Sequence, residues 1–402
     1  FGGMALDIFY LLARLSPNKL KEEGMNFNTP SFFTEIYGVS EKKSKRNQEG
    51  DAFRTMSTLS RPGISPHLFP MHLMANAAFL ELNDMGYALP PYREIPVPIR
   101  MDDKHAQAYQ LFKEDFAENI KEIPTLRGIS SISKMVNSLY HYADSPRNMG
   151  MVGMYDNEGR YHEICEPMSL DENHIVNKLQ KLTDIVETEI SEGRKNLVYV
   201  QDTGERSATR LDTYLYEHFK ELGYNVGILS KDSSYDGIKQ PKSSIDREAW
   251  LKEMMDKHDW DILITNPRLV KVGLDLLDFP NIHFYQLGFS TFDYMQASRR
   301  SWRISQTKDV KVYTYYYEET IQESSLKHMA KKIDASLAMQ GKFSEEGLRA
   351  MADNSDGMNA LARELLDNDV LAEVTESVHD IFARKNQSFE EMQSTEFQEY
   401  EG

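Results

Sequence analysis

Short apolar runs alternate with amphipathic stretches through the second half of the chain. The runs are rich in β-branched residues and lie at residues 195–201, 224–229, 261–265, 281–286 and 310–317. Apolar runs of this length without polar alternation are typical of parallel strands that are buried on both faces. Between the first two runs, apolar residues recur at helical spacing from Leu211 to Leu222, and Gly223 ends that segment. The pattern predicts βαβ units and an α/β fold, with a parallel sheet flanked by helices.

Helical spacing marks the C-terminal part of the chain, which predicts a helical addition to that sheet. Apolar residues recur in this way over residues 347–352, 358–367 and 370–384. Five glutamates follow Lys385 with no basic residue among them. We therefore expect the last residues to form an acidic tail in contact with solvent.

Composition bounds the class of protein. The 402 residues, 40% of them hydrophobic, are enough to bury a large core and indicate more than one domain. Cys165 is the only cysteine, which excludes an internal disulfide and a cysteine zinc ribbon, and no other cluster predicts a metal site. Because no apolar run approaches the length of a membrane span and no signal segment opens the chain, we expect a cytoplasmic protein without membrane contacts.

Charge is negative overall and unevenly distributed. The formal net charge of −17 argues against a broad nonspecific coat of nucleic acid, but it does not exclude a local groove. Residues 41–51, in contrast, are polar and basic. An exposed loop is the simplest interpretation of this segment, and a nucleic-acid contact is the alternative. The tyrosines of the run 310–317 favour strand packing over a platform for stacked bases.

Residues 296–306 combine glutamine and arginine side chains between two of the predicted strands. We expect a short helix here that carries Gln296, Arg299, Arg300 and Arg303. The three arginines are spaced so that their side chains can share one helical face. A guanidinium group keeps its charge and offers a rigid fork of donors, which suits phosphate oxygens. From the arginines alone, surface ion pairs would be the simpler explanation.

The residues around these arginines favour phosphate binding over surface ion pairs. The pattern Gln-Ala-x-x-Arg-x-x-Arg-Ile-x-Gln resembles the last helicase motif of superfamily 2, in the form found in Swi/Snf-type DNA translocases. The resemblance implies a RecA-like second lobe in which Arg300 and Arg303 are the catalytic arginine fingers and Gln296 faces the nucleotide. Arg299 stands where the family usually has Asp, and we expect it to be an ordinary surface residue.

A second resemblance lies one strand upstream, in residues 266–277. The residues from Gly273 to Leu276 read Gly-Leu-Asp-Leu, close to the fifth motif of the same family, although Val270 and Lys271 replace its usual glycine pair. The resemblance implies that Gly273 and Asp275 bind the nucleotide, and that this loop and the turn after the first strand contact the nucleic-acid backbone. The nucleic-acid contacts implied are Thr265, Asn266, Arg268, Lys271, Asp202 and Thr203.

The phosphate cradle of such a motor is not evident in this sequence. A Gly-rich loop ending in Gly-Lys-Ser/Thr and an acidic strand end for magnesium are both missing. Residues 1–15 resemble the segment that follows the family's third motif and leads into a helix, which implies a helical N-terminal addition. Residues 89–101 resemble the segment that closes the first lobe. We therefore expect a fragment of a longer protein. Its upstream RecA-like lobe would make most of the contacts to ATP and Mg²⁺.

The resemblance divides the chain into four regions. They are the end of the first lobe with an insertion (1–101), a helical protrusion and linker (102–170), the second RecA-like lobe (171–340) and a helical appendage with the acidic tail (341–402). The leading hypothesis is the C-terminal portion of an ATP-dependent nucleic-acid translocase or helicase, with double-stranded DNA as the favoured partner. The alternative is a non-catalytic module of RecA-like fold that binds nucleic acid or protein. Unwinding versus translocation, DNA versus RNA and the oligomeric state stay open.

Overall fold

The computed structural model describes residues 5–46, 53–65, 67–73, 89–126, 129–156, 158–203, 210–270 and 274–339. The helical appendage expected at 341–402 lies outside them, as do Lys271 and Gly273. The chain divides into two compact units. The first comprises residues 1–81 and 328–360, and the second comprises residues 82–327 and 361–402.

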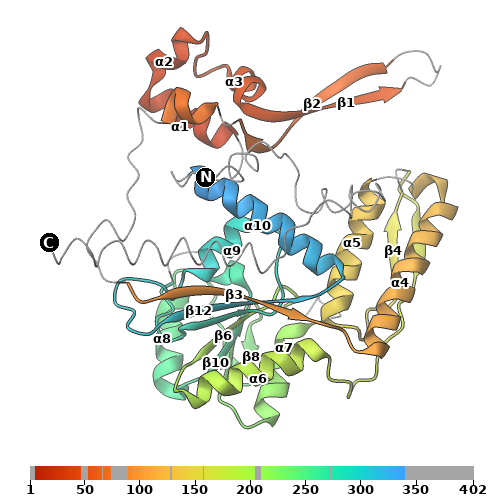
Figure 1. Cartoon of the computed structure of the whole chain (residues 1–402), viewed down its shortest axis with the longest axis vertical. Coiled ribbons are helices and arrows are strands. Elements are labelled where there is room, and N and C mark those ends of the chain that lie inside the picture. Colours follow the sequence, from red (N-terminus) through yellow and green to blue (C-terminus); the bar gives the residue numbers. More distant parts are fainter. Residues whose placement is uncertain are drawn as a thin grey trace. The chain divides into compact units, whose positions relative to one another are not determined.

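The second unit is built on a six-stranded sheet in the order β3-β12-β11-β6-β10-β7 (Figure 1). Its strands are β3 (Tyr92–Ile99), β6 (Asn196–Tyr199), β7 (Val226–Leu229), β10 (Ile262–Thr265), β11 (Asn281–Phe284) and β12 (Val310–Tyr317). Every pairing within the sheet is parallel. The predicted RecA-like α/β fold, a parallel sheet flanked by helices, is confirmed.

Amphipathic helices connect these strands. They are α6 (Asn177–Ser191), α7 (Leu211–Glu221), α8 (Arg247–His258) and α9 (Thr291–Ser298). Helix α7 packs against β7 and β10, and α6 packs against β3, β6 and β12. The apolar residues that predicted α7 are buried from Leu211 to Phe219, whereas Leu222 is half-exposed. A small hairpin, β8 (Ser234–Tyr235) with β9 (Ile238–Lys239), precedes α8.

Before α6, the second unit contains two longer helices and a hairpin. They are α4 (Asp103–Glu122), α5 (Ile129–Asp144), β4 (Val152–Tyr155) and β5 (Tyr161–Cys165). The side chain of Asp102 accepts a hydrogen bond from the His105 amide and caps α4. Helix α10 (Ile321–Met339) follows β12 and continues into the part of the chain assigned to the first unit. None of the helices in the described residues has the length and apolarity needed to cross a bilayer.

Strand β3 is an unexpected member of the sheet. The sequence placed residues 89–101 with the first lobe, but β3 pairs with β12 along its full length, from Tyr92 opposite Val310 to Ile99 opposite Tyr317. Proline cannot donate to a strand ladder, so Pro96 and Pro98 restrict β3 to an outer position in the sheet. The tyrosines of β12 are buried inside the sheet layers, which confirms that they pack rather than form an open stacking platform.

In the described residues up to position 73, the first unit forms three short helices and a two-stranded ribbon. They are α1 (Ala5–Leu15), α2 (Pro17–Glu22), α3 (Pro30–Tyr37), β1 (Gly38–Arg46) and β2 (Phe53–Ile64), followed by a helical turn at Phe69–Leu73. Its core gathers Phe9, Leu12, Phe33 and Leu68. The expected exposed loop at 41–51 is wrong for residues 41–46, because these residues pair with β2 as part of β1. Residues 47–51 of that prediction lie outside the described residues.

Candidate functional site

The predicted site residues follow three neighbouring strands. Because β10, β6 and β11 are adjacent and parallel, their carboxyl ends meet at one edge of the sheet. Gln201 and Asp202 follow β6, Asn266 follows β10, and Gln286 follows β11. Backbone and side-chain polar groups thus converge where the apolar strands stop.

Gln286 organises this edge. Its side chain is fully buried, and its Oε1 accepts hydrogen bonds from the backbone amides of Gln201 and Asp202, both at 2.8 Å. Its Nε2 donates to Asp202 Oδ2 at 2.8 Å. Gln286 is not among the predicted site residues, although a buried run that ends in a polar amide was a visible signal.

Asp202 is held by a second partner from a distant helix. Its Oδ2 lies 2.7 Å from Nδ1 of His141, on α5. Burial alone would lower the pKa of His141, but the hydrogen bond and the charge of Asp202 outweigh it and raise that pKa. The Asp202 carboxylate is therefore part of an internal network, and the half-buried Thr203 next to it is the last described residue before position 210.

The loop after β10 is also tied internally. Thr265 is fully buried and donates to the Leu229 carbonyl at 2.8 Å, so its side chain links β10 to β7. Asn266 donates to the Gln201 carbonyl at 3.1 Å and accepts from the Arg268 amide at 3.0 Å. The Arg268 side chain, in contrast, is 70% exposed, with its Nε 3.7 Å from Asp293 Oδ2. Of these residues, Arg268 offers the most accessible charge.

The arginines do not lie on a helix, which corrects the sequence prediction. Helix α9 ends at Ser298, and Arg299 is its C-cap. Two interactions explain why the chain leaves the helix here. The Arg300 carbonyl accepts from the Leu276 amide at 3.2 Å, and the Trp302 indole donates to the Pro90 carbonyl at 2.8 Å. The segment is thus fixed by the fifth-motif loop on one side and by the start of β3 on the other.

This turn brings Arg300, Arg303 and Asp275 together. Arg303 Nε lies 3.3 Å from Asp275 Oδ1, and the two side chains are 40% and 57% exposed. Arg300 is only 7% exposed. Burial and then the neighbouring charge of Arg303 lower the pKa of Arg300, so two guanidinium groups lie close together at the end of the sheet. An anion placed between them would be strongly favoured.

Gln296 and Arg299 complete the neighbourhood. The Gln296 Oε1 atom is buried and has no hydrogen-bond partner among the described residues, which fits a contact to a ligand. Arg299 is not the surface residue that was expected. It is half-buried and lies near the phenol of Tyr92. Burial raises the pKa of Tyr92, and the positive charge of Arg299 partly opposes that rise. Tyr92 and Tyr294 both donate to the buried carboxylate of Glu94, at 2.7 and 3.0 Å.

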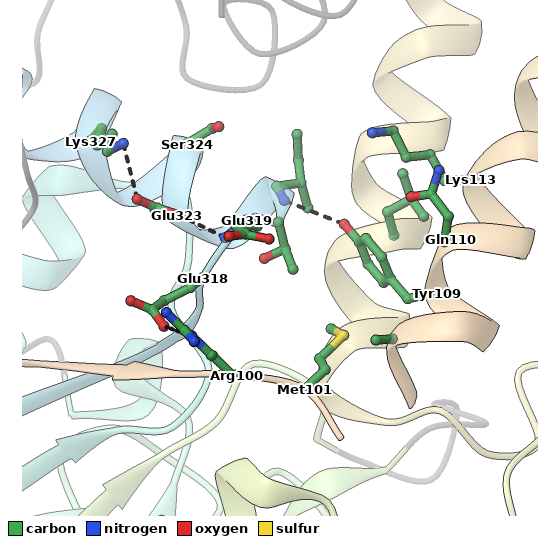
Figure 2. A pocket seen from close by; sticks show the side chains of 14 residues that line it. Arg100, Met101, Tyr109, Gln110, Lys113, Glu318, Glu319, Glu323, Ser324 and Lys327 are labelled. Carbon is green, nitrogen blue, oxygen red and sulfur yellow. Dashed lines mark hydrogen bonds and ion pairs between the residues drawn. The ribbon is translucent and has the colours of Figure 1, made fainter. Parts of the chain in front are cut away.

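A pocket of about 730 Å³ lies apart from the arginines, at the ends of β3 and β12 (Figure 2). Helices α4 and α10 line it. Four of its charged groups form two ion pairs, Arg100 with Glu318 at 3.1 Å and Lys327 with Glu323 at 3.0 Å. Lys113 and Glu319 also line the pocket, which contains none of the predicted site residues. Within the described part of the chain, no three His, Cys, Asp or Glu side chains are grouped as a metal would need.

Comparisons with known proteins agree with the motif resemblance. No family model matches the chain. Helicase SWR1 of Mycosarcoma maydis is 29% identical over 182 residues, a match that covers 44% of this chain and 9% of that protein. Two solved structures are similar at low identity. The C-terminal part of the Fun30 ATPase domain has a TM-score of 0.44 and 14% identity, and covers 70% of this chain and 99% of its own.

The second structure is the Sulfolobus solfataricus SWI2/SNF2 ATPase C-terminal domain, with a TM-score of 0.41 and 15% identity over 68% of this chain and 96% of its own. Because both structural likenesses are loose, the comparison depends on the sequence match and on the order of the motifs. The chain is similar to the C-terminal part of Swi/Snf-type superfamily 2 proteins, as the sequence predicted. It spans 9% of the length of the curated relative, so the activity of the whole protein is a matter for proposal.

Proposed function

We propose that the chain is the C-terminal portion of an ATP-dependent nucleic-acid translocase or helicase. The observation that carries the proposal is the meeting of Arg300, Arg303 and Asp275 at the carboxyl edge of a parallel sheet, beside the unpartnered Oε1 of Gln296. Arginines that do not have to reorganise are suited to neutralise charge that develops on a phosphoryl group.

An upstream RecA-like lobe would make most of the contacts to ATP and Mg²⁺. When bound, ATP would supply the phosphoanhydride bond that is cleaved. The residues of this chain fit a supporting role. Gln296 would accept a hydrogen bond from the nucleotide, and Arg300 and Arg303 would bind its phosphate oxygens. Asp275 would keep Arg303 oriented until nucleotide arrives, because its carboxylate lies 3.3 Å from the guanidinium. Asp275 and Gly273, which lies outside the described residues, would then contact the nucleotide, as the motif resemblance implies.

Nucleic acid, with double-stranded DNA as the favoured form, would follow the loop after β10. Arg268 supplies exposed positive charge there, and Lys271 would add to it. Asn266 and Thr203 border the same edge, where backbone amides can bind phosphates without reading bases. We assign Thr265 and Asp202 supporting roles rather than direct contacts, because their side chains are engaged with Leu229 and His141.

The proposal is tested by Arg303→Ala and Arg300→Ala in the full-length protein. Each change should lower ATP turnover by about 10³-fold, with nucleotide binding weakened much less, since arginine fingers act mainly in the transition state. Arg14→Ala, at an exposed position of α1, is the matched control and should leave turnover unchanged. Normal turnover in both site variants would reject the motor assignment and favour the non-catalytic binding module.

A further inference from the structure

The β1–β2 ribbon of the first unit concentrates positive charge in a strongly acidic protein. The two strands contain six Lys or Arg residues and one Glu, although the whole chain has a formal net charge of −17. The basic residues are Lys42, Lys43, Lys45, Arg46, Arg54 and Arg61. Six Ser or Thr residues lie among them in the same strands.

Strand register distributes these residues over both faces of the ribbon. In the register, Lys45 lies opposite Arg54, and Lys43 is two positions before Lys45, which assigns these residues to the same face. Lys42 and Arg46 occupy the other face, opposite Thr58 and Phe53. Neither set of alternate residues in the two strands is apolar in sequence, so the ribbon lacks the residue pattern of a strand pair that packs against a hydrophobic core. A two-stranded ribbon of this kind is only marginally stable alone in water, which favours a partner along its length.

The base of the ribbon is fixed to the helices of its own unit. The Gly38 amide donates to the Thr34 carbonyl at the end of α3, and the Ser65 amide donates to the Tyr37 carbonyl at 2.8 Å. A Cβ atom on Gly38 would lie 2.9 Å from the Cβ of Ala5, so only glycine allows this close approach. From this base the ribbon extends away from α1, α2 and α3 (Figure 1).

The size of the ribbon matches a nucleic-acid duplex. A nine-residue strand is about 30 Å long, and paired strands lie about 5 Å apart. The major groove of DNA is about 12 Å wide and admits a two-stranded ribbon. Lys and Arg with interspersed Ser and Thr hydroxyls are the side chains that contact phosphate and sugar oxygens. The bulge between Lys43 and Ser44 adds local twist, which suits a helical partner.

We propose that the β1–β2 ribbon is a nucleic-acid-binding arm that contacts the phosphate backbone of a DNA duplex. An acidic protein partner fits less well, because protein interfaces depend on buried aromatic or aliphatic anchors, and neither ribbon face offers a continuous set. A lipid surface fits less well for the same reason, since stable membrane binding combines basic charge with an apolar face. The arm lies in a different unit from the arginine site and requires no nucleotide, so it does not depend on the ATPase proposal.

The test measures binding of a labelled 30-base-pair duplex to the full chain without ATP, over a range of salt concentrations. The variant changes Lys42, Lys43 and Lys45 to Gln. We expect at least a tenfold loss of affinity at low salt, and a plot of log K against log salt that is shallower by about 2 to 3 units, since each phosphate contact contributes about 0.9.

A matched control changes Arg14, Lys19 and Lys21 to Gln, which removes the same charge from α1 and α2 of the same unit. The control should keep the wild-type slope. A Lys→Arg triple variant at the three ribbon positions should restore affinity and slope, which separates lost charge from lost folding.

Equal loss in the control would show that only net charge matters, and a wild-type slope in the ribbon variant would show that the ribbon makes no contact. Either result overturns the proposal. Vesicles with anionic lipid serve as the competing probe. If the ribbon variant lost vesicle binding and kept duplex binding, a lipid surface would replace nucleic acid as the partner. Failure of the arginine-finger test would leave this result untouched, because no turnover is measured here.

Discussion

The two basic regions of this protein hold their charge in opposite ways. At the carboxyl edge of the second unit, cations have individual partners, as Arg303 has Asp275 and Lys178 has Asp144. In the ribbon of the first unit, basic residues follow one another along two strands that contain a single glutamate. The first arrangement fixes the position of each charge, and the second accumulates charge along a line.

This difference predicts different consequences of substitution. Where a paired charge is buried, removing either member leaves the other without its counter-charge away from water, and single changes should have large effects on stability. Where many basic residues lie along one surface, each should contribute a similar small amount to binding affinity, and only multiple substitutions should cause a severe loss.

The largest effect is expected at the buried ion pair. Lys178 Nζ lies 2.7 Å from Asp144 Oδ1 and 3.0 Å from Gln322 Oε1, and the Lys and Asp side chains are almost completely buried. Lys178→Met should lower the free energy of unfolding by about 3–5 kcal/mol, because it leaves a buried carboxylate without its cation. Denaturant unfolding followed by tryptophan fluorescence measures this, since Trp250, Trp260 and Trp302 all lie in the second unit.

The double variant Lys178→Met with Asp144→Leu is the informative companion. Removing both charges should recover most of the lost stability, because an apolar pair of similar volume replaces the ion pair. If the double variant were as unstable as the single one, shape rather than charge would explain the loss.

The next effect concerns the partner of Arg303. Asp275→Asn keeps the size of the side chain but removes the charge that holds the guanidinium at 3.3 Å. Turnover of the full-length protein should fall about tenfold, a smaller loss than removing the arginine itself. Asp278→Asn changes an exposed carboxylate in the same loop and should have no effect. Equal losses in both variants would assign the effect to the loop rather than to the pair.

A pH-dependent effect is expected at His141. Its folded-state pKa is raised by Asp202 above the unfolded value of about 6.5, so its stabilisation is complete below that pH and is lost as pH rises through the folded pKa. Asp144 also favours the charged form, and Lys134 opposes it. His141→Gln should cost about 1.5 kcal/mol at pH 6 and much less at pH 9. Unfolding curves at pH 6 and pH 9 measure this difference, with His67→Gln as the control. A loss of stability that did not depend on pH would show that His141 contributes through packing.

Arg268 should give the smallest effect, because its situation is intermediate between the two regions. It is 70% exposed and only loosely paired with Asp293. Arg268→Gln should reduce the salt dependence of duplex binding by about one unit and leave stability unchanged. Lys252→Gln, on the exposed side of α8, provides the comparison. An unchanged slope would remove this loop from the nucleic-acid path.

The sheet was predictable because buried parallel strands have a clear sequence pattern. The runs around Leu197, Ile228, Ile264 and Ile282 contain too few polar residues to be mistaken for surface strands, and all four residues are fully or almost fully buried. Strand β3 was harder to place in the sheet, because its prolines and alternating burial do not distinguish an outer strand of this sheet from part of another lobe. Residues 41–46 of β1 were predicted to lie in an exposed loop, because this polar and basic run lacks the apolar alternation that usually identifies a strand.

For the site, residue types were more predictable than backbone conformation. Spacing of three and four residues suggested a helix for the arginines, but the contacts that end it, to Leu276 and Pro90, come from segments 24 and 212 residues away. The sequence also indicated neither the burial of Arg299 beside Tyr92 nor the bonds from Gln286 to the turn after β6. Such contacts depend on strand order, which a local pattern does not contain.

The two prolines of β3 have a consequence for how the protein behaves at high concentration. An outer strand with a full row of free amides is a template on which another chain can extend the sheet. Pro96 and Pro98 remove two consecutive donors from the outward row of β3, so an added strand would lack hydrogen bonds at adjacent rungs. This border of the sheet is thereby protected against edge-to-edge aggregation, and a variant with valine at both positions should precipitate more readily even if it folds correctly.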